Sequence, residues 1–123
     1  MKRILLMAVA ILAMPMITNA KIKVEESLVS MGTCKVTYYC SCEECSGEYG
    51  LLTSTGTHCE EGRTCAVDPD VIAYGTRVKI GDHVYVAEDC GTHVQGDHID
   101  IYLDDHERTE RLGVQYKKVY LVK

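Results

Sequence analysis

The stretch VYVAEDCGTHVQGDHIDIYLDD, residues 84–105, contains two short runs typical of β-strands, joined by a loop with two glycines. In the second run, HIDIYL, alternation places Ile99 and Ile101 on one face and Asp100 on the other. Aspartate is disfavoured in the middle of a strand, so its position between two isoleucines indicates a specific role. Asp89 ends the first run, where the plain alternative is a turn aspartate that accepts local N–H groups.

Six runs along the chain share this strand-like character. Each is rich in β-branched residues or tyrosine, and turns that contain glycine separate them. The runs are CKVTYY (34–39), RTCAV (63–67), TRVKI (76–80), HVYVAE (83–88), HIDIYL (98–103) and YKKVYLV (116–122). This pattern predicts a mainly β fold, either a barrel or a sandwich. One helix is predicted after Asp104 or Asp105, with Glu107 in its first turn and Gly113 beyond its end.

A third aspartate, Asp68, lies upstream in TCAVDPDVIAYGT and is followed by proline. An aspartate at this place is typical of a helix N-cap, so a single-turn helix closed by Gly75 is predicted there. If Asp68, Asp89 and Asp100 converge, repulsion and partial desolvation keep at least one of them protonated near neutral pH. A protonated carboxyl group can donate to a glycosidic oxygen, so the three aspartates predict a site for sugar-bond cleavage.

The first twenty residues have the pattern of a secretory signal peptide. Lys2 and Arg3 precede an uncharged stretch at 4–17, and small residues follow up to Ala20. That stretch is shorter than the roughly 20 apolar residues that span a bilayer, so cleavage after Ala20 is preferred to a retained anchor. We therefore expect a secreted protein without a membrane span in its mature chain. Its parts are a signal peptide (1–20), a polar leader (21–33) and one domain (34–123).

The charge of the expected mature chain limits its partners. Removal of residues 1–20 leaves 11 basic residues against 18 acidic ones, a net charge of −7. Long-range attraction to nucleic acid or to an anionic membrane surface is therefore not expected. A neutral or cationic partner fits better, and a monomer is expected.

All seven cysteines lie after the expected cleavage point, which in an exported domain predicts a disulfide framework. Cys59 and Cys65 flank a short turn and form one plausible pair, and the odd count leaves a thiol free or paired between chains. The CxCxxC grouping at 40–45, beside His58, also fits a zinc site. Disulfides are preferred because exported thiols oxidise, so no metal or other cofactor is expected. The disulfide candidates are Cys34, Cys40, Cys42, Cys45, Cys59, Cys65 and Cys90.

Three blocks of this sequence resemble the 3D domain, a bacterial family named for its three aspartates. They are TSTGT (53–57), GRTCAVDPDVIAYGTRVKI (62–80) and VYVAEDCGTHVQGDHIDIYLDD (84–105). The same domain forms the catalytic part of membrane-bound lytic transglycosylase A and occurs in stationary-phase survival and resuscitation-type wall proteins. The resemblance covers residues 34–123 and implies a six-stranded double-psi β-barrel with one or two short helices.

The resemblance also implies an activity, that of an exported peptidoglycan lytic transglycosylase. Such an enzyme cleaves the β-1,4 bond between N-acetylmuramic acid and N-acetylglucosamine and leaves a 1,6-anhydro product. In this family a single aspartate protonates the leaving oxygen and then accepts a proton from the muramic C6 hydroxyl. Carried over, that acid/base is Asp100, with Asp68 and Asp89 completing the trio. The implied partner is the glycan strand, and the implied substrate-binding residues are Thr55, Gly56, Gly91, Gln95, Gly96, His98 and Tyr102.

Tyrosines are the other candidates for stacking on sugar rings, because the chain has no Phe and no Trp. Those that compete with Tyr102 for this role are Tyr38, Tyr39, Tyr49 and Tyr74, although packing in the core is the ordinary use of such residues.

The loop at residues 89–96 departs from the family pattern. Asp-Cys-Gly-Thr stands at 89–92 in place of the usual Asp-Thr-Gly-Gly, and Gln95 stands in place of the usual lysine. Loss of a glycine restricts the backbone, and loss of a lysine removes a cation that steadies a carboxylate or a substrate anion. An alternative function is therefore a non-catalytic wall-binding or wall-loosening module on the same barrel. A third is a disulfide-stapled secreted domain that binds a protein.

Overall fold

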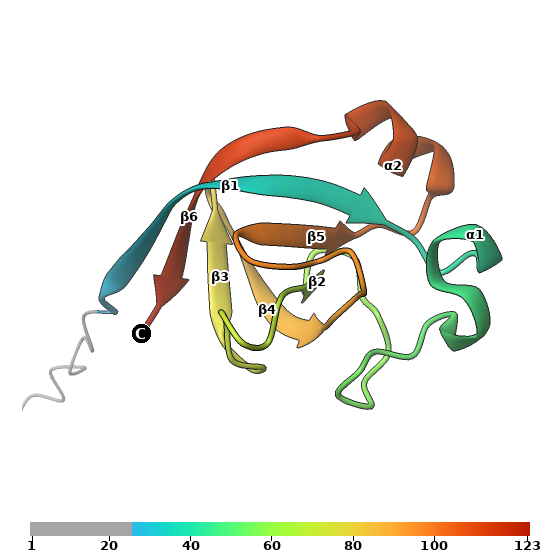
Figure 1. Cartoon of the computed structure of the whole chain (residues 1–123), viewed down its shortest axis with the longest axis horizontal. Helices are drawn as coiled ribbons and strands as arrows, with labels where there is room; N and C mark the ends of the chain where they lie inside the picture. Colours follow the sequence, from blue (N-terminus) through green and yellow to red (C-terminus); the bar gives the residue numbers. More distant parts are fainter. Residues whose placement is uncertain (1–25) are drawn as a thin grey trace, which may run out of the picture.

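The structure is a computed structural model that describes residues 26–123, so the expected signal peptide lies outside the described residues. The described part contains six strands, two short α-helices and one 3-10 turn (Figure 1). The strands are β1 (Leu28–Tyr39), β2 (Thr64–Ala66), β3 (Arg77–Ile80), β4 (His83–Asp89), β5 (His98–Tyr102) and β6 (Gln115–Val122). The helices are α1 (Glu43–Ser46) and α2 (His106–Leu112), and the 3-10 turn η1 is Gly47–Tyr49. Each of the six predicted strands is confirmed.

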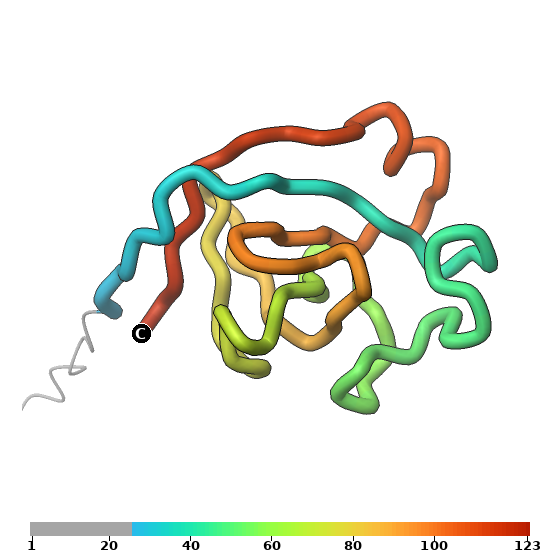
Figure 2. Tube along the Cα trace, viewed as in Figure 1, coloured from blue at the N-terminus to red at the C-terminus, as the bar shows by residue number. Residues whose placement is uncertain are grey.

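The six strands form one sheet that closes in a ring. Their order is β1-β5-β2-β4-β3-β6, and β6 pairs again with β1. The pairs β1–β5 and β2–β4 are parallel, whereas the other pairs are antiparallel. Figure 2 shows the first strand and the last strand of the chain running side by side. The mainly β class is therefore confirmed, and within residues 26–123 closure gives every strand a neighbour on each side.

β1 begins earlier than predicted, at Leu28 and not at Cys34. The additional residues pair with the end of β6, starting with Leu28 opposite Val122. The register shifts around Gly32, whose φ of 71° is a conformation that glycine adopts readily. Most of these residues are exposed, so they lack the alternation by which a half-buried strand is recognised.

The ring encloses a core of mostly aliphatic side chains. Its buried members are Cys34, Val36, Cys65, Val67, Ile72, Val78, Ile80, Ala87, Ile99, Ile101 and Val119. A small closed sheet has room inside for such side chains and little else. A second buried cluster consists of Tyr39, Cys59, Ala66, Val94 and Tyr102, in which the two tyrosine rings meet edge to face with centroids 5.5 Å apart.

The predicted disulfide framework, including the pair Cys59–Cys65, is not seen. All seven cysteines lie in the described part of the chain, and each is a free thiol there. Cys34 and Cys65 are 1% and 0% exposed and pack in the core, where a thiol behaves as a small apolar side chain. Burial raises the pKa of the Cys65 thiol to about 12, so it stays protonated.

α2 has the caps that the sequence predicts. The carboxylate of Asp105 accepts a hydrogen bond from the backbone N–H of Glu107 at 3.0 Å. At the other end, the N–H of Gly113 donates to the carbonyl oxygen of Thr109, with a φ of 57° at the glycine. Among residues 26–123, no helix is long and apolar enough to cross a membrane.

Residues 68–75 form turns, so the helix predicted there is wrong. The N–H groups of Val71 and Ile72 both donate to the carbonyl oxygen of Asp68 at 2.9 Å. The path then leaves the helical course because Ile72 enters the core and the N–H of Gly75 donates to Ala87 in β4. Contacts with the sheet thus override the local preference of this segment for a helix. The second short helix lies instead in the cysteine-rich segment, as α1.

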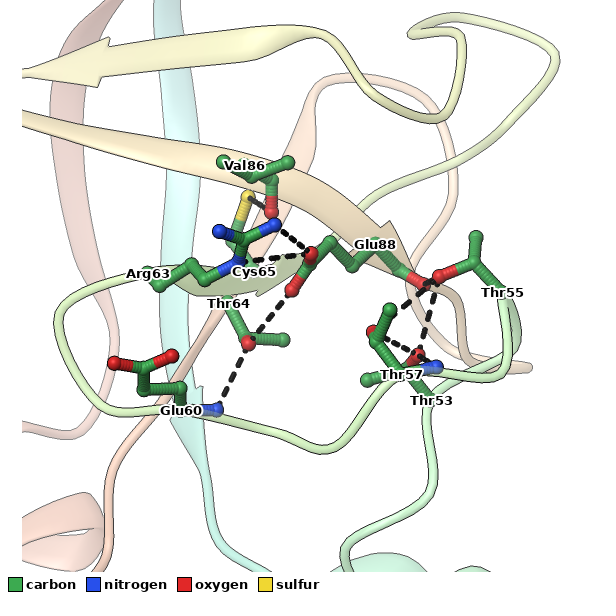
Figure 3. Close-up of polar contacts among 9 residues, drawn as sticks. All are labelled: Thr53, Thr55, Thr57, Glu60, Arg63, Thr64, Cys65, Val86 and Glu88. Atoms are coloured by element: carbon green, nitrogen blue, oxygen red, sulfur yellow. Dashed lines mark hydrogen bonds and ion pairs between the residues drawn. The ribbon is translucent and has the colours of Figure 1, made fainter.

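A buried carboxylate ties β2 to β4 (Figure 3). Glu88 is 4% exposed and accepts hydrogen bonds from Arg63 Nη2 at 2.7 Å and from Thr64 Oγ1 at 3.0 Å. The same threonine hydroxyl accepts from the backbone N–H of Glu60 at 2.9 Å. Thr64 therefore serves two polar groups at once, one of them the buried Glu88 carboxylate, which needs such partners to stay charged inside a small domain.

We predict that Thr64→Val lowers the free energy of unfolding by about 1–3 kcal/mol, because it leaves the Glu88 carboxylate and the Glu60 N–H short of a partner. Chemical denaturation measures the change. The matched control is Thr33→Val on the exposed part of β1, for which a change within about 0.5 kcal/mol is expected. Equal effects of the two substitutions would contradict this role.

Candidate functional site

Asp89 and Asp100 lie on either side of β2. Ala66, the last residue of this strand, is in register with Asp100 on β5 and with Asp89 on β4. Neighbouring strands are about 4.8 Å apart, so the two aspartates are separated by two strand spacings, about 10 Å between Cα atoms. The small side chain between them leaves space for a ligand beside both carboxyl groups.

A bulge in β4 sets the direction of Asp89. Cys65 is in register with Ala87, but the next residue, Ala66, is in register with Asp89, so Glu88 is the extra residue. Ala87 and Glu88 are both buried, which breaks the alternation of the strand. Bulges of this kind re-aim side chains beside functional sites, and their place is hard to read from a sequence.

A cavity of about 690 Å³ opens beside the two aspartates. Its lining comes from segments far apart in the chain: parts of residues 45–56, parts of residues 89–94, and Tyr39, Ala66 and Asp100. The volume is in the range of sites that bind small molecules or one or two sugar rings. Asp89 and Asp100 thus share one cavity.

The carboxyl group of Asp100 belongs to a short chain of polar groups. Its Oδ1 is 2.9 Å from Thr37 Oγ1, which is 2.7 Å from His98 Nε2. His98 Nδ1 is 2.9 Å from the carbonyl oxygen of His93, which only accepts, so Nδ1 carries a hydrogen. The threonine hydroxyl donates to an ionised Asp100 when Nε2 is protonated, and to Nε2 when Asp100 is protonated. The chain therefore accommodates a proton at either end.

Asp100 holds a proton more strongly than an exposed aspartate does. Burial raises its pKa from 3.8 to about 6, and neighbouring Asp89 adds to this in the same direction. The hydrogen bond from Thr37 and the positive charge of protonated His98 lower the pKa but do not cancel the burial. A carboxyl group with such a pKa can act as a general acid near neutral pH.

Asp89 is held in a different manner, by donors on every side. Its Oδ1 accepts from the N–H and the hydroxyl of Ser54 at 3.0 and 2.9 Å and from the N–H of Cys90 at 2.9 Å. Its Oδ2 accepts from the hydroxyl of Tyr39 at 2.9 Å. Burial and the nearby carboxylate raise the pKa of Tyr39, so this phenol remains a donor. These four hydrogen bonds hold the side chain of Asp89 in the cavity wall.

Threonine hydroxyls hold the TSTGT loop against β4 (Figure 3). Thr55 Oγ1 donates to the carbonyl oxygen of Glu88 at 2.9 Å, and Thr53 Oγ1 is 2.7 Å from Thr57 Oγ1. Gly56 has a φ of 84° and lines the cavity. Of the two residues predicted in this loop, Gly56 therefore faces the cavity, whereas Thr55 anchors the loop.

Asp68 is not one of the residues that line the cavity. Its Oδ2 accepts from the N–H of Gly96 at 2.9 Å and its Oδ1 accepts from the N–H of Asp70 at 3.0 Å, and these bonds lower its pKa. Asp68 thus braces the loop that carries Gly91 toward the cavity. The structure brings Asp89 and Asp100 to one cavity but does not place Asp68 in its lining, so a catalytic part for Asp68 stays a prediction.

Tyr102 is 1% exposed and packs against Tyr39, so the prediction that it stacks on a sugar is wrong. Alternation places it on the Asp100 face but does not reveal that this face is covered at the end of β5. Tyr49, in contrast, is 75% exposed and lines the cavity. It is the better stacking candidate among the tyrosines considered from the sequence.

The remaining predicted binding residues lie in the loop before β5. Gly91 lines the cavity, whereas the exposed Gln95 donates to the carbonyl oxygen of Thr92 at 3.1 Å. The N–H of Gly96 donates to the carboxylate of Asp68. His98 is linked to Asp100 by hydrogen bonds through the Thr37 hydroxyl. Thr92, which replaces a family glycine, has no positive φ, so the substitution strains nothing.

Thr37 is the site residue that sequence reasoning missed. Its place beside Asp100 comes from the parallel register of β1 and β5, in which the two residues are partners. Nothing in the run CKVTYY distinguishes this threonine from an ordinary strand residue, so its role depends on the pairing of strands some sixty positions apart.

Residues 63–123 match the family model of the 3D domain. The Bacillus subtilis (strain 168) protein YabE, provisionally named as a cell wall shaping protein, is 30% identical over 89 residues, which cover 69% of this chain and 21% of YabE. Escherichia coli MltA, in a crystal structure with bound chitohexaose, aligns with a TM-score of 0.52 at 21% identity over 64% of this chain and 29% of MltA. The lytic transglycosylase LtgG of Burkholderia pseudomallei aligns with a TM-score of 0.51 at 24% identity over 58% of this chain and 26% of LtgG.

The likeness to MltA and LtgG shows a shared fold. The chain spans about a fifth of YabE and between a quarter and a third of the two transglycosylases.

We predict that a ¹³C NMR titration of the Asp100 carboxyl group gives a pKa of about 6. Thr37→Val raises this pKa further, because the lost hydrogen bond favours the ionised form. Thr33→Val on the same strand is the control and leaves the titration unchanged. A wild-type value close to that of a free aspartate would mean that the carboxyl group is not desolvated.

The same shift predicts a pH-dependent stability. The folded state releases the proton of Asp100 near pH 6, whereas the unfolded state releases it near pH 3.8. The bound proton therefore stabilises the folded state at low pH, and this stabilisation is lost as the pH rises through 6. Asp100→Asn is therefore expected to be more stable than the wild type at about pH 7.5, by up to about 3 kcal/mol. Denaturation at about pH 3 should show little of this difference, because Asp100 is then mostly protonated in both the folded and the unfolded state.

Proposed function

Because this chain belongs to the 3D domain family through residues 63–123, we propose that it cleaves peptidoglycan glycan strands as a lytic transglycosylase. The observation that carries the proposal is the place of Asp100, a half-buried carboxyl group on the wall of a cavity, where burial raises its pKa to about 6. The fold shared with MltA and LtgG supports it. MltA binds chitohexaose in its crystal structure, and a glycan ligand fits the cavity proposed here.

In the proposed reaction Asp100 donates its proton to the oxygen between C1 of N-acetylmuramic acid and C4 of N-acetylglucosamine. The C1–O bond breaks, and the freed O4 carries the proton away as a hydroxyl group. The C6 hydroxyl of the muramic residue attacks C1 and closes the 1,6-anhydro ring, while its proton passes to the Asp100 carboxylate. No water is consumed, and Asp100 ends in the protonated form in which it began.

The neighbouring groups take supporting roles in this proposal. Positive charge develops at C1 as the bond breaks, and the carboxylate of Asp89 on the same cavity wall stabilises it. Asp89 is no candidate for the acid, because donors occupy both of its oxygens. Tyr49 offers an exposed aromatic face for a sugar ring, and Gly56 and Gly91 allow the glycan close to the backbone.

The proposal extends to the setting of the enzyme. Export with cleavage after Ala20 and action as a monomer on the bacterial wall both belong to it. So does a single domain, which includes β1 from Leu28 and not only the residues from 34 onward. The similarity to YabE supports an envelope location. The double-psi form of the ring is also proposed, supported by the two parallel pairs, β1–β5 and β2–β4, within an otherwise antiparallel sheet.

Digestion of purified sacculi tests this function. The wild-type protein should release 1,6-anhydro-muropeptides, identified by mass spectrometry. Asp100→Asn should keep its fold and its sedimentation with sacculi but lose at least about 100-fold in rate, because the general acid is gone. Asp97→Asn is the matched control, the same change at an exposed aspartate three positions away, and should retain activity.

The pH dependence of kcat/KM provides a second test of the role of Asp100. Asp100 must begin protonated, so kcat/KM should fall about tenfold per pH unit above the pKa of about 6. Thr37→Val should move this fall to higher pH. Normal cleavage by Asp100→Asn would overturn the assignment, and sedimentation of the wild type without any anhydro product would establish the wall-binding module in its place.

A further inference from the structure

Four metal-binding side chains meet outside the Asp100 site. Cys40 follows β1, Cys42 is the N-cap of α1, Cys45 lies within α1, and His106 is the first residue of α2. Figure 1 shows both helices at the end of the molecule to which β1 and β5 point. We propose that these four residues hold a structural Zn²⁺ ion.

The distances are those of ligands around a common centre. Nδ1 of His106 is 3.5 Å from Sγ of Cys40 and 3.4 Å from Sγ of both Cys42 and Cys45. All four ligand atoms lie within 4.8 Å of one another. Tetrahedral zinc with bonds of about 2.3 Å to sulfur and 2.0–2.1 Å to nitrogen separates S from N by about 3.5 Å.

Hydrogen bonds do not account for this arrangement. A ring nitrogen carries either one hydrogen or one lone pair, so Nδ1 can bond to one of the three sulfurs and not to all of them. A disulfide also leaves part of the cluster unexplained, because three cysteines form at most one bridge. A metal ion uses all four atoms at once.

The far side of the histidine ring supports the assignment. Nε2 of His106 is 3.1 Å from Oε1 of Glu110 and 3.4 Å from Oε2 of Glu44. Both carboxylates are exposed and only accept, so Nε2 carries the hydrogen and the lone pair of the neutral ring is on Nδ1, facing the sulfurs. Carboxylates orient zinc-binding histidines in this way in many metal sites.

The site is structural and not catalytic, because four protein ligands fill a tetrahedral zinc and leave no position for water or substrate. Its place also explains how α1 and η1 keep their form. Neither contributes a buried residue, yet Cys45, Ser46 and Tyr49 line the cavity beside Asp100. Zinc would fix this wall to the body of the domain.

Metal content of the full-length mature protein tests the proposal without reference to its activity. Protein reduced, stripped with a chelator and incubated with ZnSO₄ should hold one Zn²⁺ per chain by plasma mass spectrometry. Substitution with Co²⁺ should give the visible bands of tetrahedral thiolate coordination. Removal of zinc should release the hydrogen-exchange protection of residues 40–50 and leave that of the strands in place.

Variants identify the ligands. Cys45→Ser and His106→Gln should lose zinc, whereas the matched controls Cys90→Ser and His58→Gln should retain it, since both control residues are exposed and outside the cluster. Glu110→Gln should weaken zinc binding about 10-fold through the orientation of His106, and Glu107→Gln should not. Because Glu110 is exposed, its effect can be read even if the ligand variants fail to fold.

Absence of bound zinc from the reduced wild-type protein would overturn the proposal. So would zinc retained by His106→Gln, or cobalt bands without thiolate character. Failure of the glycan-cleavage assay leaves this inference intact, because zinc binding is measured on the protein alone.

Discussion

The pairing of β2 with a neighbour on each side is the constraint on which the site depends. This strand has only three residues, Thr64, Cys65 and Ala66, all of them buried. It runs parallel to β4 and antiparallel to β5, so its last residue faces an aspartate on both. Closure of the sheet keeps these three strands in register, because a slip of one residue would turn every side chain of β2 to the opposite face. Asp89 and Asp100 therefore meet at one cavity only while the ring is closed.

Closure also gives the two carboxyl groups opposite environments. Asp100 lies on β5 with Ile99 and Ile101 in the core on either side, and loss of water raises its pKa. Asp89 lies after the bulge at Glu88, where the chain turns outward and the N–H groups of Ser54 and Cys90 become available. The carboxyl group of Asp100 is thus desolvated, whereas that of Asp89 is surrounded by hydrogen-bond donors.

Local pattern accounts for much of the fold. Strand runs, glycine turns and the Asp105 cap depend on neighbours in the sequence and are predicted correctly. The features that the sequence did not predict share one cause, because each depends on a contact between segments far apart in the chain. Ile72 leaves the predicted helix to enter the core, Tyr102 is covered by Tyr39, and Thr37 meets Asp100 through a parallel register. The strand pattern and the resemblance to the 3D family both indicate the trio of aspartates, but Asp68 does not line the cavity, and its carboxylate accepts from two backbone N–H groups.

In the cysteine-rich segment, too, sequence spacing does not identify the residue that the fold brings close. From spacing, the histidine beside CxCxxC is His58, and disulfides are preferred to a zinc site because exported thiols oxidise. The fold brings His106 instead, 61 residues beyond Cys45, because β1 and β5 are parallel neighbours and the segments that follow them leave the ring at the same end. The register that sets Thr37 beside Asp100 therefore also sets the cysteines beside the histidine. The surroundings of Asp100 and the proposed zinc site thus both depend on the pairing of β1 with β5. The cavity wall formed by Cys45, Ser46 and Tyr49 links the two sites.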